Sequence, residues 1–191
     1  MIQYAAGEQT LRDGHIELRG TTENDMPFIR WLWSDPETMK PVGGPIHLTD
    51  AQAQQWFAKM IKPGRPTDCY RLIFNEQNEP VGEISYHRLN PATMAAELNV
   101  KIASSQRGKG YAKKAMFLFL DFFFNQVGGQ VLVDDIARDN YQAQQVLLKF
   151  GYVYVSNIND VFRVEMTRDR YNRLYPSRGI SPNRDIEEMT K

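Results

Sequence analysis

The chain has 191 residues, and its 23 basic and 23 acidic side chains give a formal net charge of zero. Hydrophobic residues make up 42% and charged residues 24%, a balance typical of a globular protein rather than a disordered one. Zero net charge argues against a dedicated nucleic-acid-binding protein, which usually carries a basic surplus. The length predicts a single domain over residues 1–175. We expect the polar, turn-rich stretch 176–191 to be a flexible tail, with an arm that clasps a second subunit as the alternative.

The single cysteine, Cys69, excludes an intramolecular disulfide and a cysteine-based zinc site, so no metal is expected. Residues 1–4 lack the basic and apolar regions of a secretory signal. The longest apolar stretch, 116–124, is interrupted by Asp121 and is far shorter than the roughly 20 residues of a membrane span. We therefore expect a cytoplasmic protein with no membrane association, and a homodimer stays open.

The first half of the chain predicts a hairpin, two helices and three strands. Two capping boxes, Thr22 with Asp25 and Thr49 with Gln52, indicate where the helices begin. The expected elements are a hairpin over 10–21 that turns at Asp13-Gly14, a helix over 23–33, an irregular loop from Pro36 to Pro45, a helix from 49 to Pro63, and strands over 70–74, 81–86 and 96–103.

The second half predicts a long apolar helix over 111–127, whose three phenylalanines at 122–124 are expected in the core. A short strand over 131–133, a helix over 140–150 and two strands over 152–158 and 161–167 follow. This order predicts a mixed α/β fold (α+β) around one mostly antiparallel sheet flanked by helices.

A glycine-rich segment between the strand over 96–103 and the long helix is the most informative motif. It reads Arg107-Gly108-Lys109-Gly110-Tyr111-Ala112. Glycines there allow backbone N–H groups to converge at the positive end of a helix, which suits a phosphate. The segment lacks the Walker A pattern, and Lys113 replaces the third glycine of the dinucleotide fingerprint. On its own, a tight turn without a ligand explains it equally well.

The motif R-x-x-G-x-A is followed about 30 residues later by Asn140-x-x-Ala143 and Phe150-Gly151-Tyr152. Together these resemble the GNAT superfamily of acyl-CoA-dependent N-acetyltransferases, over roughly residues 10–168. The run Trp31-Leu32-Trp33-Ser34-Asp35-Pro36 is similar to the branch of ribosomal-protein N-terminal acetyltransferases of the RimJ/RimL type.

This resemblance implies the GNAT fold and acetyl-CoA as co-substrate. The amides of the loop would bind the CoA pyrophosphate, and the exposed backbone of the preceding strand would pair with the pantetheine arm. An N–H of that strand would stabilise the developing oxyanion, and Asn140 would lie near the pantetheine and adenine. The implied cofactor-binding residues are Val100, Lys101, Ile102, Arg107, Gly108, Lys109, Gly110, Tyr111, Ala112 and Asn140.

The implied reaction is attack of a neutral amine on the thioester, which requires a base. Glu97 occupies a position that often carries a glutamate in this family, and Glu83 is the reserve; the alternative for Glu97 is a solvated strand carboxylate. Many members carry a tyrosine seven residues after the motif asparagine to protonate the thiolate, but Leu147 stands there. Neither Tyr141 nor Tyr152 matches that position.

Trp33, Asp35 and Asp135 are the expected substrate-binding residues, because acceptors in this fold lie between the first helices and the later strands. Trp31, Glu37, His47 and Asp134 come from the same regions, whereas His15, His87 and the basic stretch 168–178 are assigned to solvated surface. The expected acceptor is a protein N-terminal amine. A small-molecule amine, such as a polyamine or an aminoglycoside, and a catalytically silent acyl-CoA-binding module are the alternatives.

Overall fold

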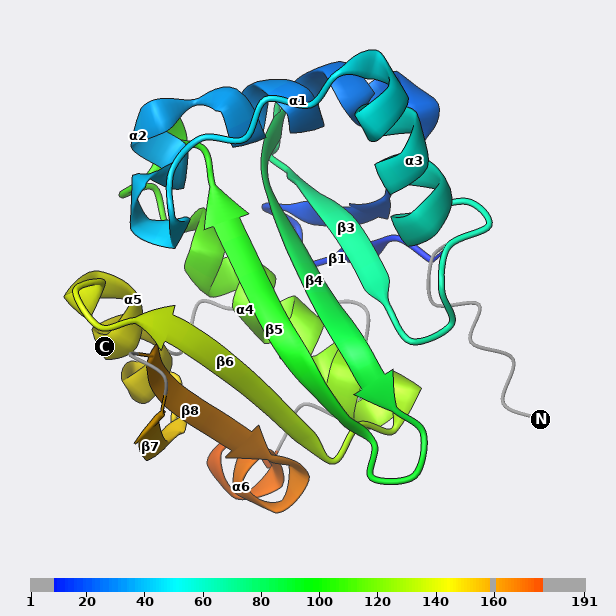
Figure 1. Ribbon diagram of the computed structural model, residues 1–191. Coiled ribbons are helices and arrows are strands. Elements are labelled where there is room, and N and C mark those ends of the chain that lie inside the picture. The colour runs from blue at the N-terminus through cyan, green and yellow to red at the C-terminus, as the bar shows by residue number, and fades with distance from the viewer. Residues whose placement is uncertain (1–8, 159–160, 177–191) are drawn as a thin grey trace.

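Within the part of the chain that the structure describes, eight strands form one sheet in the order β1-β2-β3-β4-β5-β6-β8-β7 (Figure 1). The computed structural model describes residues 9–158 and 161–176. The strands are β1 Leu11–Arg12, β2 Glu17–Gly20, β3 Cys69–Phe74, β4 Pro80–Asn90, β5 Ala95–Ile102, β6 Val131–Ala137, β7 Val153–Ile158 and β8 Val161–Thr167. Neighbouring strands are antiparallel except β5 and β6, which are parallel. The predicted fold class is confirmed.

Helices lie on both faces of the sheet, with α1, α2 and α3 on one face and α4 behind the other (Figure 1). The α-helices are α1 Met26–Ser34, α2 Pro36–Met39, α3 Asp50–Met60, α4 Tyr111–Asp121, α5 Tyr141–Lys149 and α6 Arg168–Leu174. Short 3-10 turns are η1 Glu23–Asp25, η2 Lys40–Val42 and η3 Ser104–Gln106, and η4 Phe122–Val127 is a π-helical extension of α4. Both predicted capping boxes are present, at Thr22 and at Thr49.

The two faces of the sheet bury separate apolar clusters. The larger cluster lies against α4 and includes the predicted phenylalanines at 122–124, all at most 4% exposed. The smaller cluster, on the opposite face, joins Ile29 of α1 to alternate residues of β3, and Trp33 and Trp56 pack against it. The second face therefore carries aromatic side chains beside the middle strands of the sheet.

The structure differs from the sequence-based expectation in three places. The segment 36–45, expected as an irregular loop, contains α2 and η2, because Asp35 caps α2 and Pro36 occupies its first turn. Strands β4 and β6 are longer than predicted. Residues 168–174, expected as solvated surface, form α6, which Thr167 caps and whose Tyr171 is buried. The expected tail, apart from Pro176, lies outside the described residues.

The parallel pair β5 and β6 separates after a short contact. Ala95 to Glu97 pair with Val131 to Val133, and beyond this point the strands diverge (Figure 1). Past the divergence β6 continues to pair with β8, and β5 continues to pair with β4. Gly82 permits the close β4–β5 approach, since a Cβ there would lie 2.2 Å from the carbonyl oxygen of Lys101. The two strands thus form a fork, defined here by the diverging segments 98–102 of β5 and 134–137 of β6.

Candidate active site

The predicted phosphate loop lies directly after the diverging end of β5. Gly108 and Gly110 have φ angles of 79° and 82°, a left-handed conformation that glycine adopts without steric cost. Gly110 is the N-cap of α4, so the first-turn amides of that helix, which have no partner inside the helix, face the loop. Lys109, whose ammonium group contacts Gln106 at 2.8 Å, is exposed beside them. These features suit an anionic group such as a pyrophosphate.

Contacts with α2 fix the base of this loop. The guanidinium of Arg107 donates to the carbonyl oxygens of Thr38 at 2.8 Å, Glu37 at 3.2 Å and Ile102 at 3.3 Å. Asp35 accepts from the hydroxyl of Ser104 at 2.8 Å and from both the amide and the hydroxyl of Thr38. These hydrogen bonds, first those of Thr38 and then that of Ser104, lower the pKa of Asp35. The Arg107 and Asp35 side chains thus join the loop to α2.

The remaining cofactor candidates line or flank the fork. Val100 and Ile102 pack into the larger apolar cluster, so along this part of β5 it is the backbone edge that faces the fork. Asn140 caps α5 through a hydrogen bond from the amide of Ala143 at 3.2 Å. Asp134 lies on β6 just past the separation, where burial, followed by the charge of Asp135, raises its pKa to about 7.

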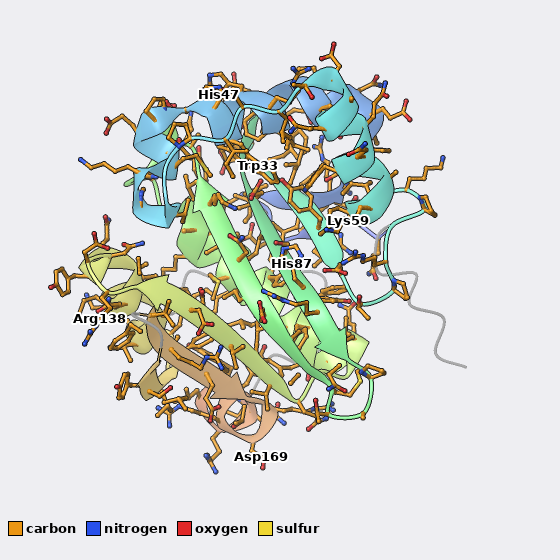
Figure 2. The ribbon with its side chains drawn as sticks, viewed as in Figure 1. Trp33, His47, Lys59, His87, Arg138 and Asp169 are labelled. Carbon is orange, nitrogen blue, oxygen red and sulfur yellow. The ribbon has the colours of Figure 1, made fainter. Side chains whose placement is uncertain are left out.

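A cavity of about 280 Å³ lies on the opposite face, beneath α1, α2 and α3. Its walls are largely aromatic and aliphatic, and its floor carries polar side chains of β4 and β5. The lining residues are Trp33, Met39, Val42, Ile46, Trp56, Tyr70, Glu83, His87, Asn99 and Lys101. Figure 2 shows the labelled Trp33 and His87 on this same face of the sheet. Val42 and Ile46, 48% and 45% exposed, form its mouth.

Glu83, 1% exposed, is the only carboxylate among the residues that line this cavity, and it is surrounded by donors. The indole of Trp33 donates to it at 2.8 Å, the hydroxyl of Tyr70 donates to the same oxygen, and the ammonium of Lys101 lies 2.5 Å from the other. Burial, and then the Glu83 charge, raise the pKa of Tyr70 well above its usual value, which keeps this hydroxyl a donor. The charges of Glu83 and Lys101 cancel, so the pair adds no net charge to the cavity.

His87 belongs to a second polar chain along the cavity floor. Its Nδ1 lies 3.1 Å from a carboxylate oxygen of Asp68, and its Nε2 lies 2.8 Å from the hydroxyl of Ser85. The sequence-based assignment of His87 to solvated surface was wrong, because its side chain is only 24% exposed and lines the cavity. Burial lowers the pKa of this imidazole and thus favours its neutral form.

The other sequence-based candidates lie outside the cavity lining. Glu97 opposes His87 in the β4–β5 register and forms an ion pair with Arg88 at the surface. Asp135 forms a bidentate pair with Arg163, with both distances 2.6 Å, and this lowers its pKa. The assignments of Glu97 as base and of Asp35 and Asp135 as substrate contacts stay predictions.

Sequence reasoning missed Trp56, Tyr70, Asp68 and Ser85. The period-two alternation of strands could have found part of this set. Polar residues recur at 83, 85 and 87 and again at 97, 99 and 101, and the register places Glu83 opposite Lys101 and Ser85 opposite Asn99. Two facing polar rows on strands that are otherwise apolar indicate a functional face.

The fold, the β5–β6 fork and the glycine-rich loop together indicate the class of protein to which the chain belongs. The sequence model of the family described as "Acetyltransferase (GNAT) domain" matches residues 15–153, well over half of the chain. The chain therefore belongs to the GNAT acetyltransferase family, as the sequence motifs indicated.

Particular relatives extend this assignment. The chain is 27% identical over 131 residues to the ribosomal-protein-serine acetyltransferase of Escherichia coli (strain K12), in a match that covers 69% of this chain and 65% of that protein, just under two thirds of its length. This similarity is in line with the RimJ/RimL-type branch. An uncharacterized N-acetyltransferase, p20, of Bacillus licheniformis is 20% identical over 147 residues, covering 75% of this chain and 82% of that protein.

Among solved structures, a spermidine N-acetyltransferase from Vibrio cholerae, in complex with CoA and spermine, superposes with a TM-score of 0.74. It is 20% identical, and the match covers 82% of this chain and 98% of that chain. A chimera of the same Vibrio enzyme matches with a TM-score of 0.73. At this identity the likeness supports the fold alone.

Two further observations concern residues 9–158 and 161–176. No helix in these ranges is both long enough and apolar enough to cross a lipid bilayer. Nor do the same residues bring together three or more His, Cys, Asp or Glu side chains that could hold a metal ion.

Proposed function

We propose that the protein transfers the acetyl group of acetyl-CoA to the N-terminal α-amine of a protein or peptide. The observation that carries this proposal is the neutral aromatic cavity beside the fork. It offers space for the first side chain of a peptide, and its only lining carboxylate, Glu83, is already paired with Lys101.

The fork and the loop support acetyl-CoA as the donor. Gly108, Gly110 and the first-turn amides of α4 provide an anion site, and Lys113 adds an exposed cation on the first turn. Beyond Glu97 no strand in the described residues pairs with the fork side of β5, so the backbone at Val100 can pair with an amide of a pantetheine arm, whereas the carbonyl oxygen of Ile102 already accepts from Arg107. When bound, acetyl-CoA supplies the thioester that the amine attacks.

The cavity favours an α-amine over a polycation. Trp33, Trp56 and Tyr70 form a continuous aromatic wall, with ring centroids 5.2 Å and 4.9 Å apart, and Lys101 lies 5.6 Å from the Trp33 ring. A polyamine carries several charges that need unpaired carboxylates, and a buried lysine repels them. A peptide presents one amine, with its chain free to leave across Val42 and Ile46.

The polyamine alternative remains the main competitor because a structural neighbour is a spermidine acetyltransferase. Steady-state kinetics with acetyl-CoA, a serine-initiated peptide and spermidine separate the two acceptors. We expect kcat/KM to be at least tenfold higher for the peptide, and the same peptide with a blocked N-terminus to be inert. A higher value for spermidine would contradict the proposal.

The silent-module alternative makes a different prediction. Such a protein would bind acetyl-CoA in a calorimetric titration but release no free CoA with any amine. Turnover of any acceptor in the presence of bound acetyl-CoA excludes it. Absence of acetyl-CoA binding at millimolar concentration would contradict both this alternative and the proposed activity.

A further inference from the structure

The chain of Asp68, His87 and Ser85 has the geometry of a proton-accepting unit. Asp68 is 4% exposed at its side chain, and its second oxygen accepts from the hydroxyl of Thr67 at 2.9 Å. A carboxylate fixed in this way accepts a hydrogen bond from Nδ1–H of His87. The proton of the neutral ring therefore lies on Nδ1, and Nε2 is the acceptor. The hydroxyl of Ser85, 1% exposed, then donates to Nε2.

The position of the Asp68–His87–Ser85 chain in the molecule is equally informative. His87 lines the cavity, and its register partner Glu97 is the last residue of β5 that pairs with β6. The imidazole therefore lies where the cavity adjoins the head of the fork. An amine in the cavity and a thioester in the fork would meet beside it.

The two carboxylates named from the sequence are less well placed for proton transfer. The oxygens of Glu83 already accept from Trp33, Tyr70 and Lys101, and the ammonium of Lys101 pairs with its charge. Glu97 pairs with Arg88 and does not line the cavity. In contrast, the lone pair on Nε2 of His87 accepts its hydrogen bond from an uncharged group, the hydroxyl of Ser85.

We propose that His87 is the general base of the acetyl transfer, with Asp68 and Ser85 as positioning residues. This inference rests on the proposed function. In the first step the acceptor ammonium gives one proton to Nε2, displacing the Ser85 hydroxyl as donor. Nδ1–H keeps its bond to Asp68, which stabilises the imidazolium, and Ser85 can then accept a hydrogen bond from Nε2–H.

The remaining steps balance without a further reactant. The neutral amine attacks the thioester carbon, the C–N bond forms and the C–S bond breaks. The second amine proton passes to the departing thiolate, which leaves as CoA thiol, and His87 releases its proton to water. An imidazole suits this task for an α-amine, because the ordinary pKa values of the two groups, about 6.5 and about 8, are close to each other.

Several charged groups act on the imidazole. Burial lowers its pKa most, Asp68 and Glu83 oppose this, and Lys101 adds to it. Glu97 opposes His87 across the strand pair, and Arg88 follows it in β4. The parent protein should therefore carry a neutral His87 at pH 7, with Nδ1 protonated. Nitrogen NMR of the isotopically labelled imidazole measures both its charge and which nitrogen carries the proton, and it needs no substrate.

Kinetics of matched variants test the catalytic role. At saturating acceptor, His87→Gln should lower kcat by roughly 10²–10⁴-fold and abolish the acidic limb of the kcat–pH profile, while the Kd for acetyl-CoA stays within about twofold. Asp68→Asn should lower kcat less and move that limb to lower pH. His15→Gln is the control, since it breaks the exposed pair with Glu76 away from the cavity.

The outcomes are distinct. If the parent turns over no amine, the proposed function is wrong and the inference with it. If the parent turns over but His87→Gln keeps its rate and acidic limb, or Glu97→Gln removes that limb instead, the inference alone is overturned. A His87 that NMR finds charged at pH 7, or protonated at Nε2 rather than Nδ1, also overturns it, even if the variants fail to fold.

Discussion

Glu83 shows how one buried side chain sets the character of the cavity. Its bonds to Trp33, Tyr70 and Lys101 connect α1, β3 and β5 through a single carboxylate. Because a buried ion pair needs both partners, the loss of one leaves the other uncompensated. The network therefore holds the aromatic wall against the sheet and keeps the cavity neutral.

Substitution of Lys101 tests how far the buried Glu83 depends on its ion pair. Lys101→Met leaves Glu83 buried without its cation and should destabilise the fold by about 3–5 kcal/mol. Arg88→Met, which breaks the exposed pair with Glu97, should cost less than about 1 kcal/mol. The double variant Lys101→Met with Glu83→Gln should recover much of the loss. Urea unfolding measures all three, and equal effects of the two single variants would contradict the account.

Asp134 should make stability depend on pH. Its pKa in the folded protein is about 7, above the ordinary value of 3.8, so between pH 4 and 7 the folded state holds a proton that the unfolded chain releases. The free energy of unfolding therefore falls as pH rises through this interval, by up to about 4 kcal/mol. Asp134→Asn should remove this fall. Urea unfolding at pH 5 and pH 8 tests it, and parallel pH dependences of parent and variant would contradict the assignment.

At the scale of elements, the short helix α2 holds the glycine-rich loop in place. Arg107 bonds to two carbonyl oxygens of α2 and one of β5, and Asp35 bonds to Ser104 in η3. With these bonds, the Arg107 guanidinium is not free to act as a mobile positive charge for a phosphate. We propose that Arg107 and Asp35 contribute to cofactor binding by fixing the geometry of the backbone between them.

Arg107→Lys tests this view because it keeps the charge and removes the planar fork of donors. One ammonium cannot satisfy the same three carbonyl oxygens, so we expect the Kd for acetyl-CoA to rise about fivefold to tenfold. Lys109→Ala, which removes an exposed charge from the same loop, should show a smaller effect with a stronger salt dependence. Calorimetry measures both. An unchanged Kd in Arg107→Lys, with a large loss in Arg107→Gln, would show that charge alone matters.

Much of the fold was predictable from sequence because its signals are local. Capping residues at Thr22 and Thr49, the glycines of the loop and the alternation in β5 each determine structure within a few residues. The helix α6 was missed because a basic segment reads as surface, whereas the cap at Thr167 and the burial of Tyr171 against the core stabilise it as a helix.

The site was less predictable, since its contacts join distant segments. Asp68 meets His87 across 19 positions, and Trp33 meets Glu83 across 50. Neither pairing leaves a motif in the sequence. The β3–β4 register brings Asp68, the residue before β3, opposite His87, and the packing of α1 on the sheet brings Trp33 to Glu83.

At the scale of the whole molecule, strand β5 unites the features that the proposed reaction needs. Its end leads into the phosphate loop, its backbone edge faces the fork, and its side chains Asn99 and Lys101 line the cavity. A donor in the fork and an acceptor in the cavity would approach this strand from different sides. The charges are divided accordingly, with cations near the loop and a neutral pair in the cavity.

Mass spectrometry of an acceptor peptide tests the central claim most directly. The parent protein is incubated with isotopically labelled acetyl-CoA and a serine-initiated peptide that also contains one lysine, and fragmentation locates the label. We expect one acetyl group on the α-nitrogen and none on the lysine. Acetylation of the lysine alone, or an unmodified peptide beside acetylated spermidine in the same mixture, would contradict it.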